Sequence, residues 1–404
     1  MTEIIDPELL PEPKHIPPPR EVSRICTRCI MDNTIHGILF DDEGICNFCS
    51  LHSKLEEEFP NDERGERVIE KYVEQIKQNG KKRPYDCVIG ISGGRDSTYL
   101  LYLAKKVWGL RPLAVHFNDG FGNPVTGKNM LNATKNLDIE LRTITSDWRE
   151  AKDLRIALLK SSTLNFGIST DIGLFNALFG TANKEKVKYI LVGHSFRTEG
   201  IVPLVWSYLD GYNMKKIHQE FGSLPLRKWH PNDPGFNYDI PHIFYYGFIK
   251  RIKILTPLYY SQYVRSYVDE LLEREVGWVN SGAHYYDDLY QSLLFYLERI
   301  KYNVDRRKPN YSALIRSGQM DREDALNKIK TPYIIEDPAV ISLCIKRLGL
   351  TKEEFAKCVD QPPKYFYDFP NRYTLMKYAK PAVKLLCLLN MIPKATYEKY
   401  YHCG

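Results

Sequence analysis

Short apolar runs alternate with amphipathic segments through the middle of the chain, between about residue 85 and residue 260. The apolar runs are rich in β-branched residues and stop at Gly, Ser, Asn or Asp, which is typical of buried strands. The segments between them carry apolar residues at helical spacing. This order predicts an α/β fold, in which a parallel sheet has helices on both faces. We expect strands at 85–91, 113–117, 139–144, 189–192 and 251–255, and helices at 96–108, 125–137, from about 147, and at 171–186.

The pattern changes on both sides of this region. Six prolines between residues 7 and 19 exclude a helix and predict an extended arm over 1–24. A helical stretch is expected at 204–221, followed by an irregular loop at 223–238 that is rich in basic and aromatic residues. After about residue 260 the apolar spacing is helical. We expect helices there at 263–275, 287–300, from 321, 338–348 and 351–359.

Composition and charge narrow the class of protein. The hydrophobic fraction of 43% describes a folded globular chain. The net charge of +6, from 56 basic and 50 acidic residues, permits anionic substrates but is too small for a typical nucleic-acid-binding protein. No apolar stretch is long enough to span a membrane, and the acidic, Pro-rich beginning does not resemble a signal peptide. We therefore expect a cytoplasmic protein without membrane or nucleic-acid partners.

Two Cys-x-x-C pairs separated by sixteen residues precede the α/β region, Cys26 with Cys29 and Cys46 with Cys49. Four thiolates at this spacing predict a closed, structural Zn²⁺ site. The alternatives are a redox dithiol or free buried cysteines, although a redox pair normally opens a helix of a thioredoxin-like unit. The expected organisation is a Pro-rich arm (1–24), a zinc ribbon (25–60), a connecting helix (61–84), an α/β domain (85–260) and a helical C-terminal region (261–404).

The first predicted strand ends in a turn that opens directly into a helix. Its two glycines permit a sharp bend and let a ligand approach the backbone. The free N–H groups and the dipole of the following helix favour an anion, and the neighbouring hydroxyls add hydrogen-bond donors. An ordinary capped turn is the alternative. We interpret this stretch as a phosphate-binding loop made of Ser92, Gly93, Gly94, Arg95, Asp96, Ser97 and Thr98.

Polar residues also follow two other predicted strands. His116 and Asn118 end the second strand, and Gly193 and His194 follow the later one. Ligands bind at the carboxyl ends of the strands in parallel sheets, so these residues are expected near the loop. A histidine at a strand end is otherwise often a structural, hydrogen-bonded residue, and that alternative stays open for both.

The hexapeptide Ser92–Ser97 in its strand–helix context resembles the pyrophosphatase loop of the PP-loop ATPases, whose fold is adenine nucleotide alpha hydrolase-like. The resemblance implies cleavage of ATP to AMP and pyrophosphate. Ser92, Gly93, Gly94, Ser97 and Thr98 would contact the phosphates, Arg95 would add a cation and Asp96 would contact Mg²⁺. It further implies that His116 and Asn118 contact the adenosine, and that Gly193 and His194 lie beside the phosphates. Ser92, Arg95, Asp96 and His194 are the candidate catalytic residues.

The chain resembles the N-acetyl sugar amidotransferase family in three features, namely the cysteine pairs, the loop and the run from Asp305 to Ala325. Proteins of that family act in the synthesis of bacterial surface polysaccharides such as the lipopolysaccharide O-antigen. The resemblance implies adenylation of the N-acetyl oxygen of a sugar acid and its replacement by ammonia, giving an acetamidino group. The chain has no recognisable glutaminase motif, so ammonia would come from a separate glutamine amidotransferase subunit. The candidate residues for an anionic N-acetylated sugar are Asp305, Arg306, Arg307, Arg227 and Trp229.

Two other functions are compatible with parts of this pattern. A tRNA-modifying PP-loop enzyme, of the thiolase or lysidine synthetase type, would use the same loop. A thiolase needs a catalytic cysteine, however, and the stretch 169–173 where one is often found has none. A tRNA enzyme would also need a larger basic excess. The second alternative is a non-catalytic zinc-ribbon adaptor that retains a nucleotide-binding fold.

Overall fold

The computed structural model describes residues 21–232, 235–282, 288–332, 337–392, 397–398 and 400–401. Most of the predicted arm, residues 1–20, lies outside the described residues. The centre of the molecule is a five-stranded sheet in the order β3-β2-β1-β4-β5, and all neighbouring strands are parallel. This confirms the predicted α/β class. The strands are β1 (Cys87–Gly90), β2 (Pro112–Asn118), β3 (Leu141–Thr145), β4 (Tyr189–Leu191) and β5 (Lys253–Leu255).

The central strand β1 determines where a ligand can bind. It pairs with β2 on one side, with Gly90 opposite Val115, and with β4 on the other, with Ile89 opposite Leu191. The strand order reverses between β1 and β4, so the connections that leave these two strands turn to opposite faces of the sheet. Such a switch point leaves a crevice at the carboxyl edge of the sheet. The predicted phosphate loop follows β1 at this point.

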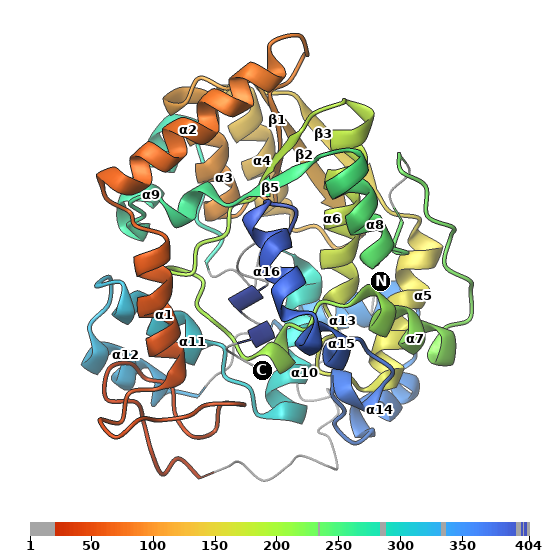
Figure 1. Ribbon diagram of the computed structural model, residues 1–404. Helices are drawn as coiled ribbons and strands as arrows, with labels where there is room; N and C mark the ends of the chain where they lie inside the picture. The colour runs from red at the N-terminus through yellow and green to blue at the C-terminus, as the bar shows by residue number, and fades with distance from the viewer. Residues whose placement is uncertain are drawn as a thin grey trace.

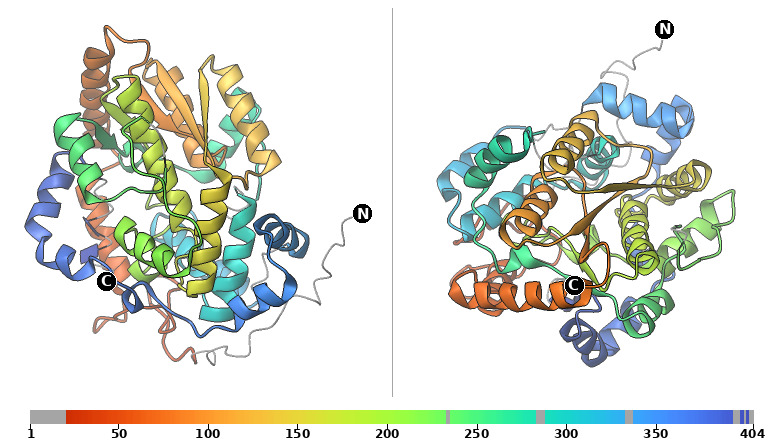
Figure 2. Two further views of the ribbon diagram at one scale, coloured as in Figure 1. Left: turned by 90° about the vertical axis from the view of Figure 1, so that its right-hand side faces the viewer. Right: turned by 90° about the horizontal axis from the view of Figure 1, so that it is seen from above.

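Helices cover both faces of the sheet (Figures 1 and 2). Cys87 and Ile89 of β1 point into one apolar layer, and Val88 between them points into the other. The first layer is formed with α2 (Glu63–Gly80), α3 (Arg95–Tyr102), α4 (Pro124–Asn136) and α9 (Arg265–Val276). The second is formed with α6 (Ile168–Lys184), against which α5 (Trp148–Ser161) and α7 (Gly211–Phe221) pack.

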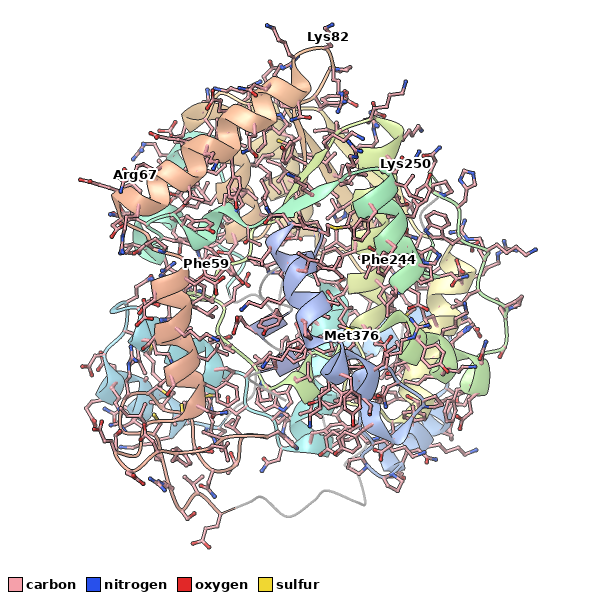
Figure 3. All side chains as sticks on the ribbon, in the orientation of Figure 1. Phe59, Arg67, Lys82, Phe244, Lys250 and Met376 are labelled. Carbon is pink, nitrogen blue, oxygen red and sulfur yellow. The ribbon has the colours of Figure 1, made fainter. Side chains whose placement is uncertain are left out.

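Early and late parts of the chain share one apolar core. The cysteine segment and α1 (Asn47–Glu58) contribute to it, together with α10 (Leu289–Tyr302), α13 (Pro338–Leu348) and α14 (Lys352–Asp360). Phe59, at the end of α1 (Figure 3), lies edge-on to Tyr259 at a ring-centroid distance of 5.0 Å. The ribbon, the end of the sheet and the C-terminal helices therefore meet, and the domain boundaries given above remain predictions. The other helices of the C-terminal region are α11 (Arg307–Arg316), α12 (Arg322–Ile329), α15 (Tyr373–Tyr378) and α16 (Lys380–Leu388).

Two predicted helices differ from the structure. The stretch 204–221 is not one helix, because only a short 3-10 turn, Leu204–Trp206, precedes α7. The Asp210 side chain accepts a hydrogen bond from Tyr212 N at 2.9 Å, so Asp210 caps a new helix. The helix expected from 171 begins earlier, at Ile168. In the described part of the chain, no helix combines the length and apolar character needed to cross a membrane.

Candidate active site

The loop after β1 is held in an open turn by its own hydroxyls. Ser92 N donates to Ser97 Oγ at 3.2 Å, and Gly94 N donates to Ser92 Oγ at 3.3 Å. The helix α3 begins directly after Gly94, and no side chain caps its N-terminus. Its first N–H groups have no acceptor within the helix. Backbone donors and the two serine hydroxyls thus converge at the switch point of the sheet, which is an arrangement for an oxyanion.

Glycine is required at two positions around this loop. Gly93 has φ +82°, and a Cβ there would lie 2.1 Å from the carbonyl oxygen of Thr126. A Cβ on Gly193 would lie 2.9 Å from the backbone of Asp96 and Ser97. The chain leaving β4 therefore touches the start of α3 only because residue 193 has no side chain. This close approach brings Gly193 to the loop, as the sequence predicted.

The other predicted nucleotide contacts lie near the loop but already have protein partners. Thr98 is fully buried, and its hydroxyl donates to Gly94 O at 2.7 Å, so it holds the turn. His116 Nδ1 lies 3.2 Å from Ile91 O, and burial lowers the pKa of this imidazole. The Asn118 side chain accepts from Gly120 N at 3.0 Å. His194 is more than half exposed, with Nδ1 3.2 Å from Glu199 Oε2.

Arg95 and Asp96 both turn toward the segment that opens α9. Arg95 Nη2 donates to Asp269 Oδ2 at 2.9 Å, and its guanidinium lies 5.6 Å from the Trp278 ring. Asp96 accepts a hydrogen bond from the hydroxyl of Tyr263. Helical spacing predicts a helix at 263–275 but does not single out Tyr263 or Asp269 as site residues. Residues 256–264, which follow the apolar run at 251–255, are mainly apolar and aromatic and give no local signal for a polar site.

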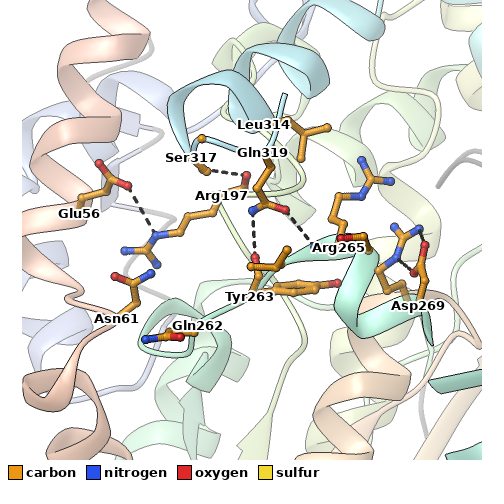
Figure 4. Close-up of a pocket in the computed structure, with 14 residues that line it drawn as sticks. Glu56, Asn61, Arg197, Gln262, Tyr263, Arg265, Asp269, Leu314, Ser317 and Gln319 are labelled. Carbon is orange, nitrogen blue, oxygen red and sulfur yellow. Dashed lines mark hydrogen bonds and ion pairs between the residues drawn. The ribbon is translucent and has the colours of Figure 1, made fainter. Parts of the chain in front are cut away.

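A cavity of about 730 Å³ lies beside this segment (Figure 4). Its walls come from the end of α1, the start of α9 and the turn after α11, and Arg95 of α3 also reaches it. Gln319 shapes the cavity, because its side chain accepts from Arg265 N and donates to Tyr263 O, both at 2.9 Å. Gln319 belongs to the run from Asp305 to Ala325, which therefore helps to shape the cavity through hydrogen bonds to the backbone of residues 263 and 265.

The four predicted metal ligands are brought together and are fully buried. Cys26 Sγ lies 3.8 Å from Cys49 Sγ, and Cys29 Sγ lies 3.7 Å from Cys46 Sγ. Sulfurs at the corners of a tetrahedron with metal–sulfur bonds of ~2.3 Å lie roughly 3.8 Å apart. The donor set therefore fits one tetrahedral ion. A four-iron cluster binds its thiolates to separate irons and would spread the sulfurs further.

Arg316, at the end of α11, is the buried counter-charge of this cluster. Its Nε donates to Cys49 Sγ at 3.2 Å and its Nη2 donates to Cys29 Sγ at 3.3 Å. Burial alone would lower the pKa of this guanidinium, but the thiolates raise it above its ordinary value. Arg322 adds hydrogen bonds to the carbonyls of Cys26 and Cys29. These two arginines tie the cysteine segment to the turn that carries Gln319.

The predicted sugar-binding residues are engaged elsewhere, and none of them lines the cavity. Arg306 forms two hydrogen bonds with Glu298, and Arg307 pairs with Asp305 at 2.8 Å. Arg227 pairs with Glu150 at 2.9 Å. The Trp229 ring stacks on the His242 ring with centroids 4.5 Å apart. Their role as substrate ligands stays a prediction, and these partners favour a structural role for the three arginines.

The parallel sheet and the loop at its switch point define the class of the molecule, an α/β protein with an anion-binding type of turn at the carboxyl edge of its sheet. Residues 283–381 match the family model "LPS biosynthesis protein WbpG-like, C-terminal domain". The C-terminal part of the chain is thus similar to a family named for lipopolysaccharide biosynthesis. This match confirms the resemblance to surface-polysaccharide proteins that the sequence indicated.

A curated relative is an uncharacterized protein, MJ1599, of Methanocaldococcus jannaschii, which is 26% identical over 172 residues. The alignment covers 42% of this chain and 58% of the length of that relative. Two solved structures resemble the chain weakly. NH3-dependent NAD synthetase of Campylobacter jejuni has TM-score 0.30 and 14% identity, over 67% of this chain and 99% of its own. The U34-tRNA thiolase NcsA of Methanococcus maripaludis, with its [4Fe-4S] cluster, has TM-score 0.32 and 14% identity. The match covers 80% of this chain and 97% of the thiolase. Neither likeness is close enough to bear on function.

Proposed function

We propose that the protein is an ATP-dependent, AMP-forming amidotransferase that converts the N-acetyl group of a sugar to an acetamidino group. The loop Ser92–Ser97 at the switch point is the observation that carries the proposal. The uncapped start of α3 and the hydroxyls of Ser92 and Ser97 offer hydrogen-bond donors at the switch point, where the phosphates of ATP would lie. The match to a lipopolysaccharide-biosynthesis family supports a sugar as the second substrate.

The reaction has two balanced steps. The N-acetyl oxygen of the sugar attacks the α-phosphorus of ATP, and pyrophosphate leaves. Ammonia then adds to the activated carbon, a proton is lost, and AMP departs with the original amide oxygen. The charge that develops on the leaving pyrophosphate is stabilised by the N–H groups at the start of α3 and by the hydroxyls of Ser92 and Ser97. Ammonia is supplied by a separate glutamine amidotransferase subunit.

Two metal ions belong to the proposal. Mg²⁺ would be held by Asp96 together with the phosphates, since carboxylate and phosphate oxygens are its preferred ligands. Tyr263 orients this carboxylate. Zn²⁺ would be held by the four cysteines, where it supplies cross-linking of the ribbon. This site is closed by its four thiolates and by Arg316, so we assign it no chemical step.

The test is an assay with the purified protein, ATP, ammonium and N-acetylated sugars. Pyrophosphate should appear only when a sugar is accepted, and mass spectrometry should show the change from amide to amidine. Ser97→Ala should reduce pyrophosphate release at least roughly tenfold, since it removes a hydroxyl donor to a charged group. Ser223→Ala, at an exposed position, is the matched control. When the protein is alone, glutamine should not replace ammonium as the nitrogen source. Pyrophosphate release without a sugar, or full activity of Ser97→Ala, would contradict the proposal.

A further inference from the structure

The cavity beside the phosphate loop contains an arginine whose charge the protein does not neutralise at short range. Arg265 is the first residue of α9 and is half-buried. Its backbone N–H is bound by Gln319 (Figure 4). Within the described residues, however, its guanidinium forms no hydrogen bond and no ion pair within 4 Å. Burial and then the charge of Arg95 lower the pKa of Arg265, and the carboxylates of Asp96 and Asp269 offset part of this effect from beyond ion-pair distance.

The other charged groups of the cavity are matched. Asp269 is used by Arg95 at 2.9 Å. Arg197 is buried and donates to Tyr259 O at 2.7 Å and to Phe59 O at 2.8 Å, and its Nε lies 3.7 Å from Glu56. Because Arg95 and Arg197 are paired in this way, Arg265 is the cation among the described lining residues that is available to bind an external anion. An oxyanion placed there would form charge-assisted hydrogen bonds with a guanidinium that is already partly desolvated.

Neutral polar side chains complete the wall. Asn61, Gln262 and Ser266 line the cavity, and within the described residues their side chains form no hydrogen bonds to the protein. Amide and hydroxyl groups suit the hydroxyls and the N-acetyl group of a sugar, because they both donate and accept. A site for pyrophosphate alone would not need them, and the loop already offers donors to the phosphates of ATP. The cavity therefore combines one unmatched cation with uncharged hydrogen-bonding groups.

We propose that this cavity binds the sugar substrate and that Arg265 is the counter-ion of the sugar's anionic group. The inference rests on the proposed function and assigns the sugar to residues other than Arg306, Arg307 and Arg227. Two sources of the anion share the same chemistry, namely the carboxylate of a sugar acid and the diphosphate of a nucleotide-linked sugar. The start of α9 would then hold the sugar beside Arg95 and Asp96, next to the reacting phosphates.

Calorimetric binding to the full-length protein separates these sources. N-acetylneuraminic acid carries a carboxylate without a diphosphate, UDP-N-acetylglucosamine carries a diphosphate without a carboxylate, and inorganic pyrophosphate carries no sugar. Arg265→Ala should weaken binding of one sugar probe by roughly 10- to 100-fold, the loss expected for a hydrogen-bonded charge pair. Arg265→Lys should keep part of the affinity. Arg274→Ala, which removes an exposed arginine of the same helix, should change nothing.

The outcome also distinguishes this inference from the proposed function. Binding of an ATP analogue depends on the loop, so it should be lost in Ser97→Ala and kept in Arg265→Ala. If both sugar probes bind Arg265→Ala as tightly as the wild type, or neither binds the wild type, the inference is wrong. It is also wrong if Arg265→Ala weakens only pyrophosphate and the ATP analogue, because the cavity then belongs to the nucleotide. In each of these cases retained ATP binding by the wild type leaves the loop assignment intact.

Discussion

Replacing Arg316 by Met removes the positive charge from the cysteine cluster and leaves a side chain of similar length. Four thiolates around one divalent ion carry a net charge of −2, and Arg316 is only 7% exposed beside them. Two of its hydrogen bonds, at 3.2 and 3.3 Å, end on thiolates. Removing one partner of a buried charged pair costs about 3–5 kcal/mol. We expect Arg316→Met to lose this much unfolding free energy and to release its metal faster.

The assay combines urea unfolding with release of zinc to a colorimetric chelator. Arg316→Lys keeps the charge but lacks the fork of a guanidinium that bonds two sulfurs at once. Its loss of unfolding free energy should therefore be roughly half that of Arg316→Met. Arg67→Met on the outer face of α2 is the control, because its side chain is 65% exposed (Figure 3). Ordinary surface substitutions change the free energy of unfolding by at most about 0.5 kcal/mol. The reasoning is refuted if Arg316→Met changes it by no more than this and releases zinc at the rate of the wild type.

Three further predictions follow from local geometry. Gly93→Ala should abolish pyrophosphate release and lower the melting temperature, because φ is +82° and the new Cβ would lie 2.1 Å from Thr126 O; an active, stable variant would show that the loop tolerates a side chain. Arg227→Gln should change the KM for the sugar by less than about threefold in steady-state assays, because Glu150 already pairs with this arginine. A tenfold rise in KM would indicate that Arg227 binds the substrate. Burial lowers the pKa of Lys301 from 10.5 to about 8. Between these values the unfolded chain binds more protons than the folded chain, so stability rises with pH. Urea titrations should therefore show that the free energy of unfolding of the wild type rises, relative to that of Lys301→Met, by up to roughly 3 kcal/mol from pH 8 to pH 10.5. A difference between the two proteins that does not change with pH would contradict the burial argument.

Much of the fold could be predicted because its signals are local. Each strand of the sheet is a short apolar run, and the turn after β1 is defined by adjacent Ser and Gly residues. The positive φ of Gly93 belongs to that turn, whereas the close contact that a Cβ would make with Thr126 O comes from α4. The break of the helix expected at 204–221 was missed, because helical spacing continued across Asp210 while its side chain capped a new helix. Capping competes with helix continuation through a single hydrogen bond, which periodicity does not reveal.

The assignment of the charged residues could not be made from the chain alone. Arg227, Arg306 and Arg307 looked like ligands for an anion because they are basic and lie in a loop or in a matched run. Their counter-ions turned out to be Glu150, Glu298 and Asp305, two of them more than a helical turn away in sequence. Arg265 carries the same charge and showed no distinguishing pattern. It differs only in that the structure places no carboxylate within ion-pair distance of its guanidinium among the described residues.

The sequence by itself determined the order of strands and helices, the anion-binding turn Ser92–Ser97 and the four cysteines, because each depends on residues close together in the chain. The tertiary structure decided which groups face one another across the site. Arg95 and Asp269 lie 174 positions apart, and Arg316 reaches Cys29 from 287 positions away. An ion pair depends on distance in space, and its strength falls steeply when solvent separates the charges. Only the folded molecule therefore shows that Arg316 belongs to the cysteine cluster and that, among the described residues, no carboxylate lies within ion-pair distance of Arg265.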